Sequence, residues 1–400
     1  MGRLAVTART PLLPLAICAA IMLLDGIDLA AMPLALPHVA AEWSVAPERL
    51  GFVLSAVLIG LGAGAFLLAP YGDKYGRRVM IVSGLGLLAV STLGTALSGS
   101  ITALFVWRFA TGLGLGICLP NVTAMTAEIA PRHFRAGAMT AISCAVPVGG
   151  LLAGLIAPVL VERWGWHSLF VGPAILTGLL VLAALLWLPS SQHAQDAPPV
   201  TRAPMLAPLT RPYWRASAVF IGLYTTNALV LYLLSSWLPA ILPDVGFTLA
   251  DAARLTAFTQ AGGLIGGLGL AFFLDRGKTV ATLLAAYAAA IAALVAIGFV
   301  APQFWVWAAA MVVVGLGSSG THLALMAVGA SFYPPAMLST AIGLAVAVAR
   351  VGAVAGPLVG AALLGWGFDV QQFLLAATVP LALCALGVLL VPTVRKPAEP

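Results

Sequence analysis

Apolar residues fill long stretches of this chain, and Pro, Gly and charged residues mark the breaks between them. A membrane-spanning helix needs about 20 mostly apolar residues. Twelve stretches have this character: 12–36, 50–70, 79–98, 103–127, 136–158, 167–188, 214–238, 252–273, 279–300, 303–327, 337–363 and 370–391. Each is predicted to be a transmembrane helix, so the predicted fold class is an all-α integral membrane protein.

The predicted spans fall into two sets of six. One extended polar segment, 189–213, separates an N-terminal half (1–188) from a C-terminal half (214–400). Landmarks recur between the halves at an offset of 202 or 203 residues, pairing Asp73 with Asp275, Gly112 with Gly315, Pro131 with Pro334 and Gly149 with Gly352. Chance matches among glycine-rich segments are the alternative, but four landmarks at a nearly constant offset favour a parallel repeat. Transporters built from such repeats bind substrate near the midplane, between the halves.

Composition and charge agree with a membrane location. Apolar residues make up 62% of the chain and charged residues 8%, whereas about a quarter of a soluble domain is charged. The net charge of +6 does not predict a nucleic-acid partner, because the basic residues form no stripe on a polar face. The first apolar stretch has no convincing cleavage site and is predicted to stay as a span.

The distribution of Lys and Arg predicts the orientation. Fourteen of the nineteen fall on the side that would hold both ends of the chain: Arg3, Arg9, Lys74, Arg77, Arg78, Arg132, Arg135, Arg202, Arg211, Arg215, Arg276, Lys278, Arg395 and Lys396. Three fall on the opposite side: Arg49, Arg163 and Arg254. Because cytoplasmic loops carry the excess of positive charge, both termini are predicted to be cytoplasmic.

Two acidic residues lie within the first predicted span. Asp25 and Asp28 are three residues apart and so share one face of a helix. Intramembrane carboxylates are expensive and mark functional sites, and a close pair titrates as a unit that can hold a proton at neutral pH. We expect Asp25 and Asp28 to bind and release protons and so to couple proton movement to transport. The alternative is structural, with one carboxylate capping a helix break at Gly26 or pairing permanently with an arginine.

Two arginines also lie within predicted spans. Arg350 is near the middle of span 11, where it could pair with Asp25 or Asp28, bind a substrate carboxylate, or form a purely structural ion pair. Arg108 is shallower in span 4 and could extend to the interface.

A glycine-flanked polar loop follows span 2. Within Gly72–Arg78, Asp73 can cap a helix N-terminus, and Arg77 can pair with Glu128 at the inner end of span 4. We expect Asp73, Arg77 and Glu128 to form a cytoplasmic gate; a topology signal alone is the alternative.

Other polar side chains project from spans and could contact substrate or a neighbouring helix. These are Asn121, Tyr224, Asn227, Tyr232, Gln260 and His322. Gly315–Gly320 matches G-x-G-x-x-G but lacks the preceding strand of a dinucleotide site. The four cysteines lie in separate apolar stretches without metal-ligand spacing. No metal and no cofactor is therefore expected.

These motifs resemble those of a known family. Gly72–Arg78 resembles the signature loop of the major facilitator superfamily, and Arg108–Gly116 resembles its span-4 motif. That resemblance implies that Arg108 takes part in proton transfer.

Asp25-Gly26-Ile27-Asp28 resembles the span-1 signature of the aromatic acid/proton symporters. The segments 119–121, 145–149 and 345–350 resemble the 3-(3-hydroxyphenyl)propionate transporter branch. The resemblance implies that Asp25 and Asp28 couple protons and that Arg350 anchors a substrate carboxylate.

The sequence thus predicts a secondary transporter, not an enzyme, that imports a small aromatic carboxylate with protons by alternating access. We expect a monomer that spans the bacterial inner membrane. The main rival is a proton-antiporting exporter of drugs or metabolites with the same fold. A membrane sensor would need an added cytoplasmic domain. An integral membrane enzyme would need a recognisable set of catalytic residues, which the sequence does not contain.

Overall fold

The computed structural model describes residues 12–131, 135–190, 206–274 and 276–394. Twelve of its helices are long and apolar enough to cross a membrane, as predicted. The N-terminal half comprises α1 (Leu12–Glu42), η1 (Pro47–Leu50), α2 (Gly51–Ala63), η2 (Gly64–Leu68), α3 (Tyr71–Tyr75), α4 (Arg77–Ala96), α5 (Ile101–Ile129), α6 (Arg135–Ser143), α7 (Ala145–Trp164) and α8 (Ser168–Trp187). The C-terminal half comprises η3 (Ala207–Leu209), α9 (Trp214–Ile241), η4 (Leu242–Val245), α10 (Leu249–Leu274), α11 (Thr279–Ile297), α12 (Phe304–Gly315), η5 (Leu316–Gly320), α13 (Thr321–Ala330), α14 (Pro335–Gly365), α15 (Val370–Val388) and α16 (Val391–Val394).

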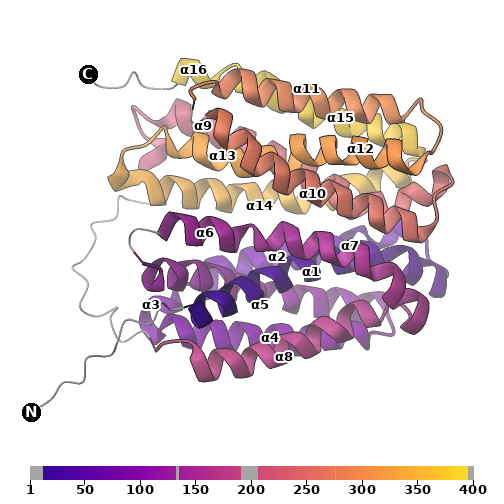
Figure 1. The fold of residues 1–400 in the computed structure, drawn as a ribbon, viewed down its shortest axis with the longest axis horizontal. Coiled ribbons are helices and arrows are strands. Elements are labelled where there is room, and N and C mark those ends of the chain that lie inside the picture. Colours follow the sequence, from indigo (N-terminus) through magenta and orange to yellow (C-terminus); the bar gives the residue numbers. More distant parts are fainter. Residues whose placement is uncertain (1–11, 132–134, 191–205, 275, 395–400) are drawn as a thin grey trace, which may run out of the picture.

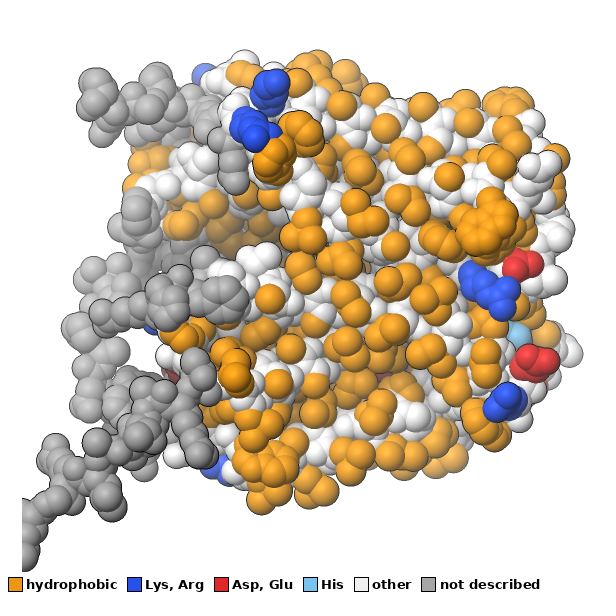
Figure 2. All heavy atoms as spheres, in the orientation of Figure 1, with side chains coloured by type: hydrophobic (Ala, Val, Ile, Leu, Met, Phe, Trp, Pro, Cys, Tyr) orange, Lys and Arg blue, Asp and Glu red, His pale blue; other side chains and the backbone are white. Residues whose placement is uncertain are grey.

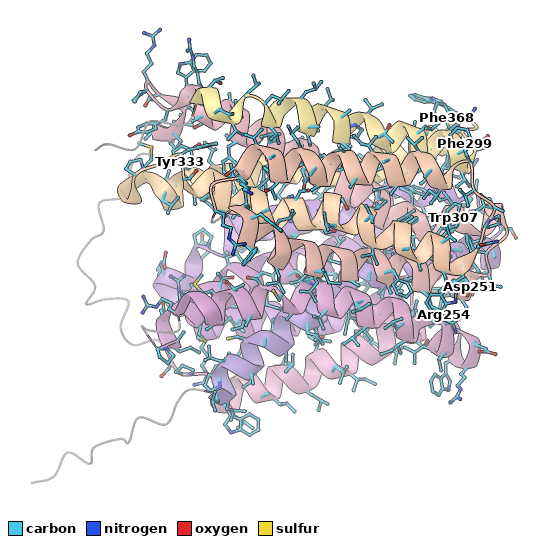
Figure 3. All side chains as sticks on the ribbon, turned by 45° about the horizontal axis from the view of Figure 1, so that its top comes forward. Asp251, Arg254, Phe299, Trp307, Tyr333 and Phe368 are labelled. Atoms are coloured by element: carbon cyan, nitrogen blue, oxygen red, sulfur yellow. The ribbon has the colours of Figure 1, made fainter. Side chains whose placement is uncertain are left out.

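The two halves lie side by side as separate helical bundles, with α14 and α10 of one facing α2 and α7 of the other (Figure 1). We call the end of the bundle where α1 begins and α15 ends the terminal side, and the opposite end the far side. Tyr333 marks the terminal side, whereas Asp251 and Arg254 mark the far side (Figure 3). Apolar side chains cover the broad middle of the surface, and charged ones gather towards the two ends (Figure 2).

Several helices are longer than predicted because proline does not end them. The first span continues to Glu42 through Pro33 and Pro37, and the seventh continues to Val245 through Pro239. The predicted ends at 36 and 238 were wrong. Neighbouring helices and local 3₁₀ or π adjustments satisfy the backbone groups that proline frees within a membrane.

The repeat predicted from the sequence appears in the helix crossings. A Cβ added to Gly112 on α5 would overlap the carbonyl oxygen of Val57 on α2. In the C-terminal half, a Cβ on Gly315 would overlap the carbonyl oxygen of Thr259 on α10. Thr259 follows Val57 by 202 residues, and Gly315 follows Gly112 by 203. The same crossing is therefore built twice, from glycines that let two backbones touch.

A second crossing repeats in the same way. Gly149 on α7 lies against the carbonyl oxygen of Leu23 on α1, and Gly352 on α14 lies against that of Thr225 on α9. Thr225 follows Leu23 by 202 residues. Together the crossings confirm a parallel pseudo-repeat of two six-helix halves. The landmark Asp275 and the linker positions 191–205 lie outside the described residues.

Candidate functional site

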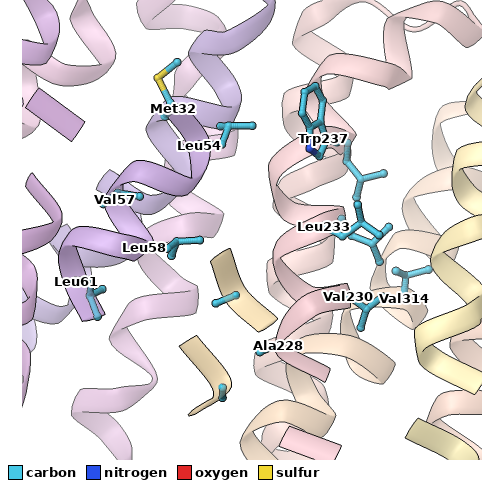
Figure 4. Packing of buried hydrophobic residues seen from close by; sticks show 14 of the residues in the cluster. Met32, Leu54, Val57, Leu58, Leu61, Ala228, Val230, Leu233, Trp237 and Val314 are labelled. Atoms are coloured by element: carbon cyan, nitrogen blue, oxygen red, sulfur yellow. The ribbon is translucent and has the colours of Figure 1, made fainter. Parts of the chain in front are cut away.

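A cavity of about 430 Å³ lies between the two halves, within the usual range of ligand pockets. Residues of α1, α2, α5, α6 and α7 line it on one side, and residues of α9, α10, η5, α13 and α14 on the other. Apolar side chains such as Met32, Leu54, Val57 and Leu58 form much of its wall (Figure 4). Its larger polar side chains are Arg108, Tyr224, Tyr232, Gln260, His322 and Arg350.

The two halves are in contact on the far side, where a Cβ added to Gly51 on α2 would overlap the Cβ of Ala361 on α14. There the Ser55 hydroxyl on α2 donates a hydrogen bond to the carbonyl oxygen of Val354 on α14, at 2.9 Å. Nearer the middle, a Cβ added to Gly62 on α2 would be 3.9 Å from the Arg350 side chain. The two helices therefore diverge from the far side towards the terminal side, where the surface is hollowed between the halves (Figure 2).

Arg108 and Asp28 form a buried ion pair inside the N-terminal half. The Arg108 side chain is 0% exposed and that of Asp28 is 3% exposed. Nη1 of Arg108 donates to both carboxylate oxygens at 3.0 Å, and Nη2 donates to the Asp28 carbonyl oxygen at 3.3 Å. The Thr92 hydroxyl donates to the same carboxylate at 3.5 Å. The idea that Arg108 extends to the interface was wrong, because Asp28 compensates its charge within the bundle.

Asp25 is buried as deeply as Asp28 but lacks such a partner. Its side chain is 3% exposed, and Oδ1 accepts no hydrogen bond from any described residue. Arg350 on α14 interacts electrostatically with Asp25 and with Tyr232 of α9. Arg350 forms no ion pair within 4.0 Å among the residues that the structure describes. The two predicted acids therefore differ: Arg108 neutralises Asp28, and Asp25 is the acid that interacts with Arg350.

His322, Tyr224 and Asn227 are held together in the C-terminal half. The His322 ring stacks on Tyr224, with centroids 4.2 Å apart, and both residues line the cavity. Asn227 is fully buried behind them, and its Oδ1 is 2.9 Å from Nδ1 of His322. Of these three predicted substrate contacts, two reach the cavity. Asn227 instead supports His322.

Gln260 extends across the boundary between the halves. It lines the cavity from α10, and its amide lies against Gly150 of α7, where an added Cβ would overlap it. Gly150 thus provides the space that the Gln260 side chain occupies. This placement keeps Gln260 among the candidate substrate contacts.

Asn121 is away from the cavity and joins the cluster predicted as a gate. Its amide donates to the backbone oxygens of Ile117 and Ala69, and its Oδ1 accepts from Arg77 at 3.4 Å. Arg77 also pairs with Asp73 and, at 3.5 Å, with Glu128. The structure therefore brings the three predicted gate residues together. All of them belong to the N-terminal half, so the cluster does not itself bridge the halves.

Some cavity residues were not predicted. Ser235 and Ser236 of α9 line the cavity beside Tyr232, and Ser319 reaches it from the π-helical turn η5. A signal for Ser235 exists in the sequence, because Tyr224, Tyr232 and Ser235 are spaced by eight and then three residues, as expected for one helix face. The π turn that presents Ser319 has no comparable pattern, although such turns are frequent at functional sites.

Two pseudo-equivalent six-helix bundles with a cavity between them define a class of multi-pass membrane transporters, not enzymes. The sequence profile of the Major Facilitator Superfamily matches residues 18–303. The chain belongs to this superfamily.

Its relatives include transporters that are named for their substrates. The chain is 31% identical to a 4-hydroxybenzoate transporter of Pseudomonas putida, over 93% of this chain and 90% of the relative. It is 30% identical to a 3-(3-hydroxy-phenyl)propionate transporter of Escherichia coli K12, over 98% of this chain and 99% of the relative.

Solved structures share the fold. A crystal structure of a bacterial homolog to the human lysosomal transporter Spinster, in an inward-facing and unoccupied conformation, aligns with a TM-score of 0.74. The alignment covers 98% of this chain and 100% of that one at 19% sequence identity. At this identity the likeness concerns the fold alone.

Proposed function

We propose that this protein imports a small aromatic carboxylate together with protons. The observation that carries the proposal is the position of Arg350, which lines a central cavity of suitable size and interacts electrostatically with the buried Asp25 carboxylate. Arg350 offers a carboxylate two parallel hydrogen bonds, and Tyr224 and the apolar wall offer surfaces for an aromatic ring. Relatives that transport 4-hydroxybenzoate and 3-(3-hydroxyphenyl)propionate support the substrate class.

Charge balance in the cavity links the substrate to the proton. An isolated guanidinium in a low-dielectric site is costly, so Arg350 requires one nearby anion. Without substrate, the Asp25 carboxylate supplies it. When a substrate carboxylate binds Arg350, two anions would lie near this one guanidinium, and protonation of Asp25 restores the balance. One proton is therefore taken up with each substrate anion at this site.

Asp28 and Arg108 have a supporting role in this mechanism. Their bidentate pair fixes α1 against α5, so that Asp25, one helical turn away, faces Arg350. Proton transfer between the two acids remains possible because they share a helix face. Asp73, Arg77 and Glu128 are proposed to close the terminal side when the halves tilt, in agreement with their position near that end.

The contacts between the halves support alternating access. They meet on the far side, and their helices diverge towards the terminal side. The excess of Lys and Arg on the terminal side supports a cytoplasmic location for it. In a bacterial inner membrane this form would release substrate into the cytoplasm, and the opposite tilt would admit it from outside.

The test is uptake of labelled 4-hydroxybenzoate and 3-(3-hydroxyphenyl)propionate into proteoliposomes under an imposed pH gradient. We expect accumulation when the outside is acidic.

Asp25→Asn should abolish accumulation but keep exchange of labelled for unlabelled substrate, since Arg350 then has only the substrate as its anion. Asp251→Asn, which alters contacts with Thr248 and Arg254 on the far side, is the matched control. Accumulation by Asp25→Asn at the normal rate would contradict the mechanism. Efflux driven by the same gradient would favour the exporter.

A further inference from the structure

The ring of His322 has one face covered and one edge turned to the cavity. His322 is the second residue of α13, directly after the π-helical turn η5. Its ring is nearly parallel to that of Tyr224, with an interplanar angle of 12°. Stacking fixes the plane of the imidazole, so only the ring nitrogens can make directional contacts.

The hydrogen bonds behind His322 determine which ring nitrogen carries the proton. The Thr321 hydroxyl donates to the carbonyl oxygens of Gly317 and Ser318, at 2.8 and 3.0 Å. Its oxygen is left to accept a hydrogen bond from the Asn227 amide at 3.0 Å. The same amide nitrogen donates to the Tyr287 hydroxyl at 3.2 Å. Because the amide nitrogen faces these two acceptors, the amide oxygen of Asn227 faces His322.

An amide oxygen can only accept. Nδ1 of His322, 2.9 Å from that oxygen, must therefore carry a hydrogen. Arg350 already places one positive charge beside the same cavity, so a neutral imidazole avoids a second one. In a neutral imidazole with a hydrogen on Nδ1, Nε2 has a lone pair and no hydrogen. Among the described residues, no hydrogen bond uses Nε2.

We propose that Nε2 of His322 accepts a hydrogen bond from a hydroxyl group on the substrate, and that this protein selects hydroxylated aromatic acids over unsubstituted ones. The inference rests on the proposed function and adds a second anchor to it. Arg350 binds the carboxylate from α14, and His322 binds the ring hydroxyl from α13. A site built to hydrogen-bond a substrate hydroxyl rejects the analogue that lacks it.

The test compares three matched ligands on purified protein in detergent at constant pH, where no gradient is needed. Benzoate, 4-hydroxybenzoate and 4-methoxybenzoate differ only in the substituent, and the corresponding 3-substituted phenylpropionates form a second series. A hydroxyl donates, whereas a methoxy group only accepts. We expect the hydroxyl compound to bind about three- to tenfold more tightly than the unsubstituted one, and the methoxy compound to gain nothing.

Two variants separate this role from a merely structural one. His322→Phe keeps a ring against Tyr224 but has no acceptor, so the ratio of hydroxybenzoate affinity to benzoate affinity should fall to about one. His322→Gln returns an oxygen at a similar reach and should restore part of the preference. An unchanged hydroxyl preference in His322→Phe would overturn the inference and leave the proposed function standing.

The wild-type protein alone provides a further test of the inference. Equal binding of the methoxy and hydroxyl compounds would show that Nε2 does not act as an acceptor, and this would overturn the inference even if His322→Phe did not fold. Failure of every aromatic carboxylate to bind would instead refute the proposed function itself.

Discussion

Replacing Asp28 and Asp25 by asparagine, one at a time, should affect stability in very different ways. Both are buried acids on the same helix face, and both substitutions remove one charge. Asp28, however, accepts two hydrogen bonds of 3.0 Å from an arginine that is 0% exposed. Oδ1 of Asp25 has no hydrogen-bond partner among the described residues.

The expected magnitudes follow from these contacts. Asp28→Asn leaves the Arg108 guanidinium buried without its counter-charge, and breaking a buried pair in this way costs about 3–5 kcal/mol. Asp25→Asn breaks no ion pair within 4.0 Å among the described residues. The Arg350 side chain that loses its counter-charge lines the cavity and is only partly buried, so the free energy of unfolding should fall by about 1 kcal/mol or less. Arg108→Gln combined with Asp28→Asn should recover much of the loss, because neither charge remains.

The assay is thermal unfolding of the purified variants in one detergent, together with unfolding by increasing denaturing detergent to obtain free energies. Asp28→Asn should unfold well below the wild type, and Asp25→Asn close to it. If the two single variants lost the same stability, Asp28 would not be the partner of a buried guanidinium. A double variant no more stable than Asp28→Asn would refute the reasoning as well.

Two further predictions concern glycines at helix crossings. Gly154→Leu should favour the conformation in which the halves separate on the far side, because even a Cβ there would approach a backbone oxygen of α10 at 2.7 Å. The overpacking should cost about 1–3 kcal/mol. Spin labels placed on the far-side ends of α7 and α10 should therefore lie farther apart in the variant, and unchanged distances would contradict this prediction. Gly112→Ala should lower the unfolding temperature, because its Cβ would overlap the carbonyl oxygen of Val57. Gly86→Ala, which would project into open space, should not; equal effects in the two variants would contradict the assignment of that crossing.

The spans and the repeat could be predicted because they depend on local composition and spacing. Apolar length determines whether a helix can cross the membrane, and a glycine at a fixed offset indicates the same crossing in both halves. Gly112 and Gly315 illustrate how closely the two halves match, because even the backbone oxygens that they contact are related by the repeat. Such contacts depend on backbone position alone.

The chemistry could not be predicted in the same way. At the repeat positions of Asp28 and Arg108 the C-terminal half has Val230 and Met311, both fully buried. One half therefore has a buried ion pair where the other has two buried apolar residues. Which acid Arg108 selects depends on the rotation of α1 about its axis. The sequence places Asp25 and Asp28 on one face and gives no measure of that rotation.

Asn121 and Asn227 show a related limit. Both are polar residues within spans, and the sequence offers the same interpretation for each. In the structure one supports the loop after α2 and the other orients a cavity histidine. A difference of about 100° per residue around a helix decides whether a side chain meets substrate or a neighbouring helix.

The glycine crossings also have a mechanical consequence. Because backbones touch directly within each half, the six helices of a bundle resist sliding past one another and act as a stiff lever that pivots on the far-side contacts. A 27-residue span such as Phe304–Ala330 is about 40 Å long, so a tilt of about 10° displaces its free end by about 7 Å. This is comparable to the breadth of a benzene ring, and a small rocking angle would be enough to let the cargo pass.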